Sequence, residues 1–113
     1  MPRRLDARER GQFTHVPVRD LDRARLVYVP VLTPGIAGMT LGRWVLLRRG
    51  HEQDADLIAH ELVHVRQWRE LGAVRFLVRY LGAYVGGRWR GLGHRAAYES
   101  IPLETEARLV SGR

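Results

Sequence analysis

Residues 57–68 of this chain read LIAHELVHVRQW and contain two histidines four positions apart, His60 and His64, with Glu61 directly after the first. On an α-helix, which advances about 100° per residue, His60 and His64 lie about 40° apart and one turn displaced, so both imidazoles can reach one point. Glu61 lies at the edge of the same sector, where it can contact a ligand of a metal ion but is poorly placed to bind the ion itself. Zinc-dependent hydrolysis uses this arrangement, because the imidazoles hold the ion and the carboxylate takes the proton of its bound water. A histidine pair alone does not hold a catalytic metal, so a third ligand must come from elsewhere in the chain.

The pattern around the motif predicts a long helix over residues 54–71. The polar stretch EQDAD provides an N-terminal cap, and Gly72 provides a stop. The face with the two histidines also carries three large apolar residues, Leu57, Trp68 and Leu71. The opposite face is expected to contact water and carries Asp56, Arg66, Gln67 and Glu70. We therefore expect the histidines to point into the protein.

Several residues outside the helix can provide the third ligand. The candidates are His94, Glu99, Glu104 and Glu106 downstream, and His15 and His51 upstream. Pro102 predicts the first turn of a final helix that runs to about Val110, and Glu104 falls in that turn. Taken alone, Glu104 can equally be a capping carboxylate and Glu106 a solvated surface charge, so the residues themselves leave both alternatives open.

The combination of HELVH at 60–64 with PLETEA at 102–107 resembles the gluzincin zinc peptidases, particularly small bacterial peptidase-like domains. The resemblance covers roughly residues 25–110. It implies that His60, His64 and Glu104 hold one Zn²⁺ ion and that Glu61 is the catalytic base, with Glu106 the alternative third ligand. One departure is Arg108, which stands where the family has an aspartate that supports a ligating histidine. The resemblance also implies an edge strand above the metal, within residues 35–47, on which an extended peptide can pair.

A hydrolase of this kind also needs a hydrogen-bond donor for the developing oxyanion. The candidates before Glu104 are His94, Arg95 and Tyr98. Each has an ordinary structural alternative: a loop histidine, a solvated arginine and a core tyrosine, respectively.

The remaining sequence predicts an α+β fold, a minimal zincin-like domain. Residues 25–29 are expected to form a strand, and residues 36–41 and 43–47 to form a hairpin or meander. The motif helix and two further helices follow, over 73–85, ended by Gly86-Gly87, and over 102–110. Residues 1–12 are expected to be a flexible lead-in, and residues 13–113 a single metallopeptidase-like domain.

Composition restricts the possible partners. The chain has 113 residues, no cysteine and a net charge of +7, and all its basic residues are arginines. A metal must therefore be held by histidine and carboxylate. Because the arginines are dispersed, charge does not favour a nucleic-acid partner.

We expect a cytoplasmic location, since no signal peptide or transmembrane segment is visible. Residues 74–85, which include Arg75 and Arg79, are interpreted as part of a core helix whose arginines reach water, with a membrane-surface helix as the alternative.

These features together predict a zinc metallopeptidase that hydrolyses peptide bonds of a peptide or protein substrate through a zinc-bound water, with Glu61 as general base. One alternative is a non-catalytic domain that zinc stabilises and that binds a partner. A weaker alternative is an arginine-rich nucleic-acid-binding module. The sequence does not indicate the oligomeric state.

Overall fold

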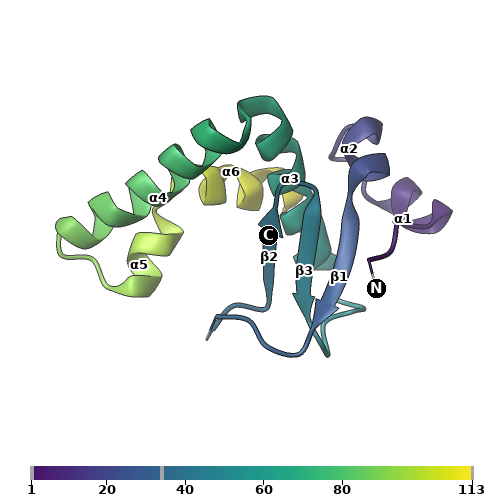
Figure 1. Cartoon of the computed structure of the whole chain (residues 1–113), viewed down its shortest axis with the longest axis horizontal. Helices are drawn as coiled ribbons and strands as arrows, with labels where there is room; N and C mark the ends of the chain where they lie inside the picture. Colours follow the sequence, from purple (N-terminus) through teal and green to yellow (C-terminus); the bar gives the residue numbers. More distant parts are fainter. Residues whose placement is uncertain (1, 34, 113) are drawn as a thin grey trace.

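The computed structural model describes residues 2–33 and 35–112. Met1, at the start of the expected lead-in, and Arg113, at the end of the expected domain, lie outside the described residues. The fold is α+β, as predicted: a three-stranded sheet with helices around it (Figure 1).

The sheet consists of β1 (Arg25–Val29), β2 (Gly38–Leu41) and β3 (Trp44–Arg48), in the order β1-β3-β2. The predicted hairpin is confirmed, since β2 and β3 pair antiparallel across a tight turn in which Gly42 has φ +66°. A meander would place β1 beside β2, but β1 pairs in parallel with β3 instead. This order leaves β2 at one edge of the sheet.

The motif lies on α3 (Ala55–Leu71), which begins and ends close to the predicted limits. The Asp54 side chain caps it by accepting a hydrogen bond from the Leu57 backbone N–H, and Gly72 follows its last turn with φ +79°. Its apolar residues pack against the sheet, where Leu62 and Val65 join Leu26 and Val45 in the core. The histidine-bearing helix is thereby fixed against β2, with which it is in contact.

The helix after the motif is longer than expected. We expected it to end at Gly86-Gly87, but α4 (Ala73–Trp89) continues through both glycines. The reason is tertiary packing: a Cβ atom on Gly87 would lie 3.1 Å from the Cβ of Ala97, so only glycine lets α5 (His94–Glu99) approach this closely. The sequence predicted no helix between residues 87 and 102, so α5 was not expected. The final helix, α6 (Pro102–Ser111), begins at Pro102 as predicted.

The interpretation of α4 as a core helix is wrong. Only Phe76 and Gly87 of this helix are buried, and Figure 1 shows that α4 projects away from the sheet. Among the described residues, no helix is long and apolar enough to cross a membrane.

The two interior glycines of α4 should respond differently to alanine. At Gly82 nothing lies within 4 Å of an added Cβ, so Gly82→Ala should stabilise the protein by about 0.5–1 kcal/mol through its higher helix propensity. At Gly87 the contact with Ala97 opposes the same gain, so Gly87→Ala should be neutral or destabilising. Urea unfolding of both variants checks this, and an equal gain from both would contradict the close α4–α5 contact.

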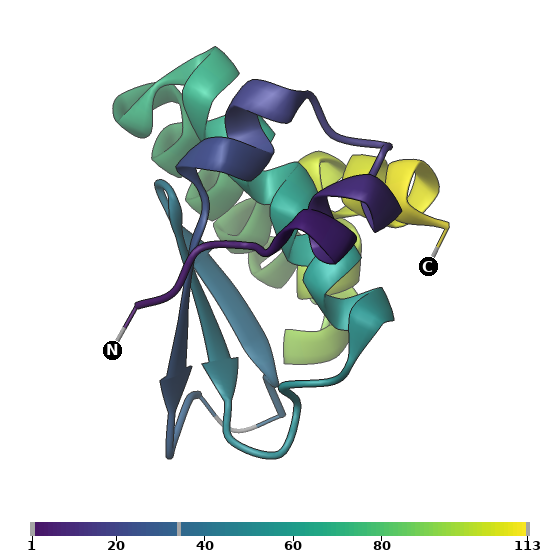
Figure 2. The same ribbon diagram turned by 90° about the vertical axis from the view of Figure 1, so that its right-hand side faces the viewer.

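The N-terminal residues are more structured than the sequence indicated. Residues 2–12, expected to be a flexible lead-in, include a backbone bridge between Arg3 and Leu26 and the helix α1 (Ala7–Gln12). A reciprocal capping box between Asp6 and Glu9 begins α1. The further helix α2 (Val18–Arg23) packs against α3. Both short helices face the viewer in Figure 2.

The buried carboxylate of Glu9 accepts two hydrogen bonds from Arg3, at 2.7 and 2.8 Å, and one from the backbone N–H of Asp6. The hydrogen bonds from Arg3 hold the pKa of Glu9 below its usual value, although partial burial acts in the opposite direction. Because the pKa is lower in the folded state, this carboxylate stabilises the fold above the unfolded value of about 4.3 and loses that effect as the pH falls through the folded value.

Glu9→Gln should therefore lower the free energy of unfolding by about 1–2 kcal/mol near neutral pH, and by less at acid pH. Urea unfolding of both proteins at several pH values measures this. A difference that does not shrink on acidification would mean that the charge of Glu9 contributes nothing.

Candidate metal centre

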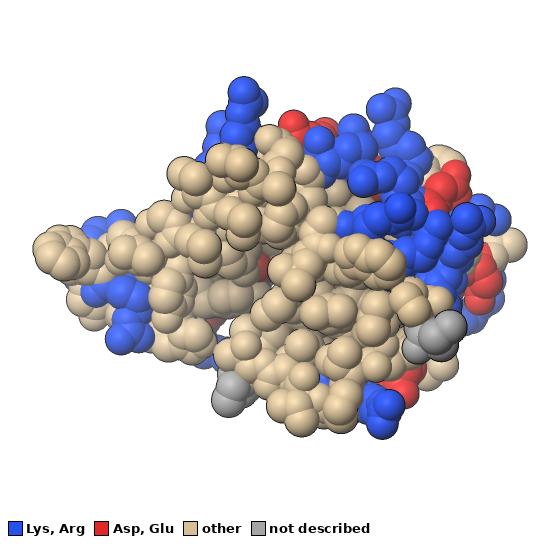
Figure 3. Space-filling view, viewed as in Figure 1, with Lys and Arg blue, Asp and Glu red and all other residues tan. Residues whose placement is uncertain are grey.

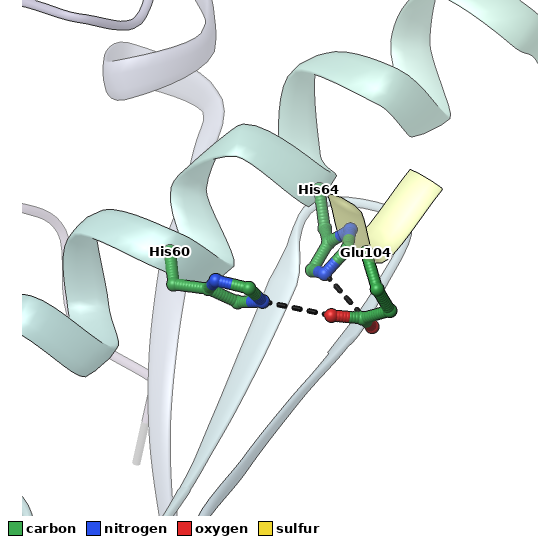
Figure 4. A group of neighbouring side chains, drawn as sticks. All are labelled: His60, His64 and Glu104. Carbon is green, nitrogen blue, oxygen red and sulfur yellow. Dashed lines mark hydrogen bonds and ion pairs between the residues drawn. The ribbon is translucent and has the colours of Figure 1, made fainter. Parts of the chain in front are cut away.

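The histidine pair lies on the buried side of α3, as the helical spacing predicted. His60, Glu61 and His64 are all buried, and the centroids of the two imidazole rings are 5.1 Å apart. Both rings point toward the first turn of α6 (Figure 4). The helix thus presents two imidazole nitrogens to one region of space.

The third side chain in this region is Glu104. Pro102 is at the start of α6, and the first turn that follows directs the carboxylate of Glu104 into the protein, where it is buried. Its Oε1 atom lies 2.8 Å from His60 Nε2, and its Oε2 atom lies 3.1 Å from His64 Nε2. One ligand atom from each of these three residues lies within 4.8 Å of the other two. Residues forty positions apart in the sequence therefore form a compact set of two nitrogen donors and one carboxylate.

The alternative carboxylate, Glu106, has different partners. Its half-exposed side chain accepts hydrogen bonds of 2.7 Å from Arg66 and from Gln67. It does not belong to the cluster of His60, His64 and Glu104. Of the other candidate ligands, His15 is hydrogen-bonded to the Ala59 carbonyl, 2.8 Å away.

Gln67 has a role that the sequence did not indicate. We expected it on the water-exposed face of the helix, but it is buried, and its Oε1 accepts a hydrogen bond of 2.7 Å from Nδ1 of His64. Its amide nitrogen donates to the Leu103 carbonyl, at 3.0 Å, and so connects α3 to α6. With the proton on Nδ1, His64 presents the lone pair of Nε2 toward Glu104. Gln67 is thus a hydrogen-bond partner that orients His64, whereas Arg108, at the position where the resemblance implied a supporting aspartate, donates to the backbone carbonyl of Glu99.

Gln67→Leu should therefore weaken zinc binding by about 10- to 100-fold, since an outer partner of a ligating histidine typically has an effect of this size. Competition with a chromophoric zinc chelator measures the change. Gln12→Leu, at an exposed position, is the matched control and should bind like the wild type. Unchanged affinity in a folded Gln67→Leu protein would show that this hydrogen bond does not orient His64.

Glu61 is held beside the cluster by the edge strand. The Thr40 hydroxyl on β2 lies 2.9 Å from the carboxylate Oε1 of Glu61 and 3.1 Å from its backbone carbonyl. Burial raises the pKa of Glu61, while the neighbouring His64 and His60 lower it in part. A carboxylate with a raised pKa is a better proton acceptor in a buried site. Thr40 was not among the predicted site residues, because nothing in the sequence aligns β2 with α3.

The side chains of the cluster shift one another's pKa values. Burial alone would raise the pKa of Glu104, but the hydrogen bond with His60 and the close approach of His64 lower it well below its usual range. For His64, burial acts to lower the pKa, and Glu104 and Glu61 more than offset this and raise it. Tyr80 also donates a hydrogen bond to Oε2 of Glu104, and burial and the Glu104 charge raise the pKa of this phenol. The Glu104 carboxylate is therefore ionised, as a metal ligand must be.

The cluster opens into a cleft of about 450 Å³. His60, Glu61 and Glu104 line it together with all three candidates for the oxyanion donor, His94, Arg95 and Tyr98. Burial raises the pKa of Tyr98, so its phenol keeps its proton and can donate. Nδ1 of His94 is hydrogen-bonded to the Tyr84 hydroxyl, 2.9 Å away. A second, mainly apolar cleft of about 330 Å³ lies between β2 and α4 and adjoins the first. In Figure 3, atoms of acidic residues are visible in a hollow near the middle of the face that the figure shows.

The fold and the site define a class of protein: a small α+β domain with a buried His-Glu-x-x-His helix and a carboxylate facing it from a later helix. The family model of the eCIS core domain, where eCIS denotes extracellular contractile injection system, matches residues 5–72. The chain belongs to the eCIS core domain family, because this match covers more than half of it. The matched segment includes the sheet and α3 but ends before Glu104. No curated protein and no solved structure gives a significant match.

Proposed function

We propose that this protein is a zinc metallopeptidase of the gluzincin type. One observation carries the proposal: His60, His64 and Glu104 converge within 4.8 Å of one another, with Glu61 beside them in the same cleft. Two imidazoles and one carboxylate are the donor set of catalytic zinc in several peptidases.

The chemistry of these residues fits a zinc ion. All three side chains are buried, which metal-free polar groups tolerate only when they are fully hydrogen-bonded. Yet Nε2 of His64 makes no well-directed hydrogen bond with the described residues, although Oε2 of Glu104 is 3.1 Å away. For a neutral His64, an acceptor lone pair aimed at a carboxylate is unfavourable. Either a metal cation between the two groups or a proton on Nε2, which the raised pKa of His64 favours, removes this conflict. The hydrogen bond from His64 Nδ1 to Gln67 orients that lone pair, and Tyr80 orients the carboxylate.

The reaction is the hydrolysis of a peptide bond. When bound, zinc would supply Lewis acidity, which lowers the pKa of a water molecule toward 7 and polarises a carbonyl group. The chain's own groups would do the rest. Glu61 accepts the proton of the attacking water at a carboxylate oxygen and delivers it to the nitrogen of the leaving amine. Tyr98 or His94 donates to the carbonyl oxygen as negative charge develops there.

The substrate would bind as an extended peptide along β2. This strand is at the sheet edge, and Thr40 on it contacts Glu61, so the edge and the base lie side by side. Gly38 on the same strand is close to α3, because an added Cβ would lie 3.1 Å from the Leu57 side chain and 3.3 Å from that of Glu61. The free backbone groups of such an edge can pair with a peptide in the cleft.

The proposal is tested with the zinc-loaded protein and a mixed peptide library analysed by mass spectrometry. We expect cleavage that a chelator abolishes and added zinc restores. Stoichiometric zinc binding without cleavage of any peptide would overturn the peptidase proposal and favour a non-catalytic, zinc-stabilised binding domain.

A further inference from the structure

The helix α4 carries an apolar stripe on its exposed side. The stripe comprises six residues with the following exposed fractions: Val74 76%, Leu77 42%, Val78 66%, Leu81 54%, Val85 61% and Trp89 90%. They recur every three or four positions and so occupy one side of the helix. On the opposite side, Phe76 and Gly87 are buried against the rest of the protein. In the part of the chain that the structure describes, nothing covers the outer residues of the stripe, and Leu77 and Leu81 at its margin also line the apolar cleft between β2 and α4.

This arrangement is unusual for a helix at a protein surface. Such a helix normally places polar residues opposite its packed face, whereas a helix that is apolar on both sides is normally covered on both. The exposed side of α4 extends over about 25 Å, the length of a 17-residue helix. A contiguous apolar surface of this extent indicates a contact with another surface.

The charges beside the stripe indicate what that surface is. No acidic residue occurs between Glu70 and Glu99, while the same segment contains Arg75, Arg79, Arg88, Arg90 and Arg95. On a helical projection, Arg75 and Arg79 lie roughly 90–130° from the middle of the stripe, at its flank. A second copy of the chain docked on α4 would bring together two arginine-rich segments that contain no acidic residue to pair with them, which disfavours self-association. The charges instead complement an anionic surface.

We propose that α4 lies in the plane of an anionic lipid membrane. The apolar stripe enters the boundary between headgroups and acyl chains, and Arg75 and Arg79 contact lipid phosphates at its flank. Trp89, exposed at the end of the helix, has the amphipathic ring that favours this boundary. The helix lies on the membrane and does not cross it. This inference does not depend on the proposed peptidase activity.

Flotation with lipid vesicles tests the proposal. The wild-type protein should float with vesicles that contain phosphatidylglycerol and much less with vesicles of phosphatidylcholine alone. The double variant Val78→Asp/Val85→Asp should bind the anionic vesicles roughly tenfold or more weakly. The control is Val18→Asp/Leu109→Asp, which changes the net charge by the same amount at residues that are 68% and 78% exposed on other helices. It should retain most of the binding.

Three results would overturn the proposal. The first is no binding of the wild type to anionic vesicles. The second is an equal loss in the two double variants, which would show that net charge and not the stripe of α4 determines binding. The third is a dimer, seen by light scattering, that dissociates in Val78→Asp/Val85→Asp while vesicle binding is unchanged. Circular dichroism of both variants checks that each is folded, and their exposed positions make unfolding an unexpected outcome.

Discussion

Glu61→Gln is expected to bind zinc as the wild type does and to cleave peptides at least about 1,000-fold more slowly, in the range that removal of a general base produces. Glutamine has the size of glutamate and can still accept the hydrogen bond from Thr40, so the cleft should keep its shape. It cannot take a proton from water. The comparison requires kcat/KM for one peptide from the library and the zinc content of both proteins.

Glu99→Gln is the matched control for this experiment. Glu99 also lines the cleft but is not part of the metal cluster, so its replacement should change kcat/KM little. Cleavage by Glu61→Gln at the wild-type rate would remove Glu61 from the mechanism. Loss of zinc from Glu61→Gln would instead give this residue a structural role, and the rate would then say nothing about a base.

The second large effect is expected at Glu104. Glu104→Gln should lower zinc affinity by more than about 100-fold, because it replaces a charged ligand with a neutral one and the loss should exceed that of an outer partner. The change also leaves His60 and His64 without the carboxylate that now contacts both. Zinc affinity measured by competition with a chelator, at constant pH, provides the comparison.

Glu106→Gln is the matched control, since it makes the same chemical change two residues further along α6. It should retain wild-type affinity, because Glu106 is not part of the cluster and the amide oxygen of glutamine can still accept the hydrogen bonds from Arg66 and Gln67. The reverse result, with zinc lost on changing Glu106 and kept on changing Glu104, would contradict the assignment of the third ligand.

The site residues that could be predicted from the sequence are those whose positions follow from helical spacing, helix capping and the place of a proline. The spacing of His60 and His64 on a helix fixes their common direction, and Asp54 and Gly72 limit that helix by capping. Pro102 determines where α6 begins and thus which way Glu104 points. The structure brings these three side chains together as expected, while their binding of zinc remains a prediction.

What the sequence could not give depends on contacts between distant segments. Its position on the helix assigned Gln67 to the water-exposed face of α3. It is buried because α6 packs against this face and contacts Gln67 through Leu103. A signal was available in its three-residue spacing from His64, which allows the observed hydrogen bond. The pairing of β1 with β3 and the support of Glu61 by Thr40 required the sheet topology. Likewise, Gly87 remains helical because Ala97 packs on it.

The exposure of α4 has the same origin. Its hydrophobicity is a property of the sequence, but which of its apolar residues face the protein depends on Phe76 packing against Trp68, with ring centroids 4.2 Å apart. Sequence alone could not distinguish a core helix from one that is packed on one side and apolar on the other.

Diffraction from crystals of the zinc-loaded protein, measured on both sides of the zinc absorption edge, tests most directly whether His60, His64 and Glu104 bind zinc. We predict one strong anomalous peak about 2.0–2.2 Å from Nε2 of both histidines and from a carboxylate oxygen of Glu104. The absence of a peak among these three residues in fully zinc-loaded protein, or a peak held by other side chains, would contradict this prediction.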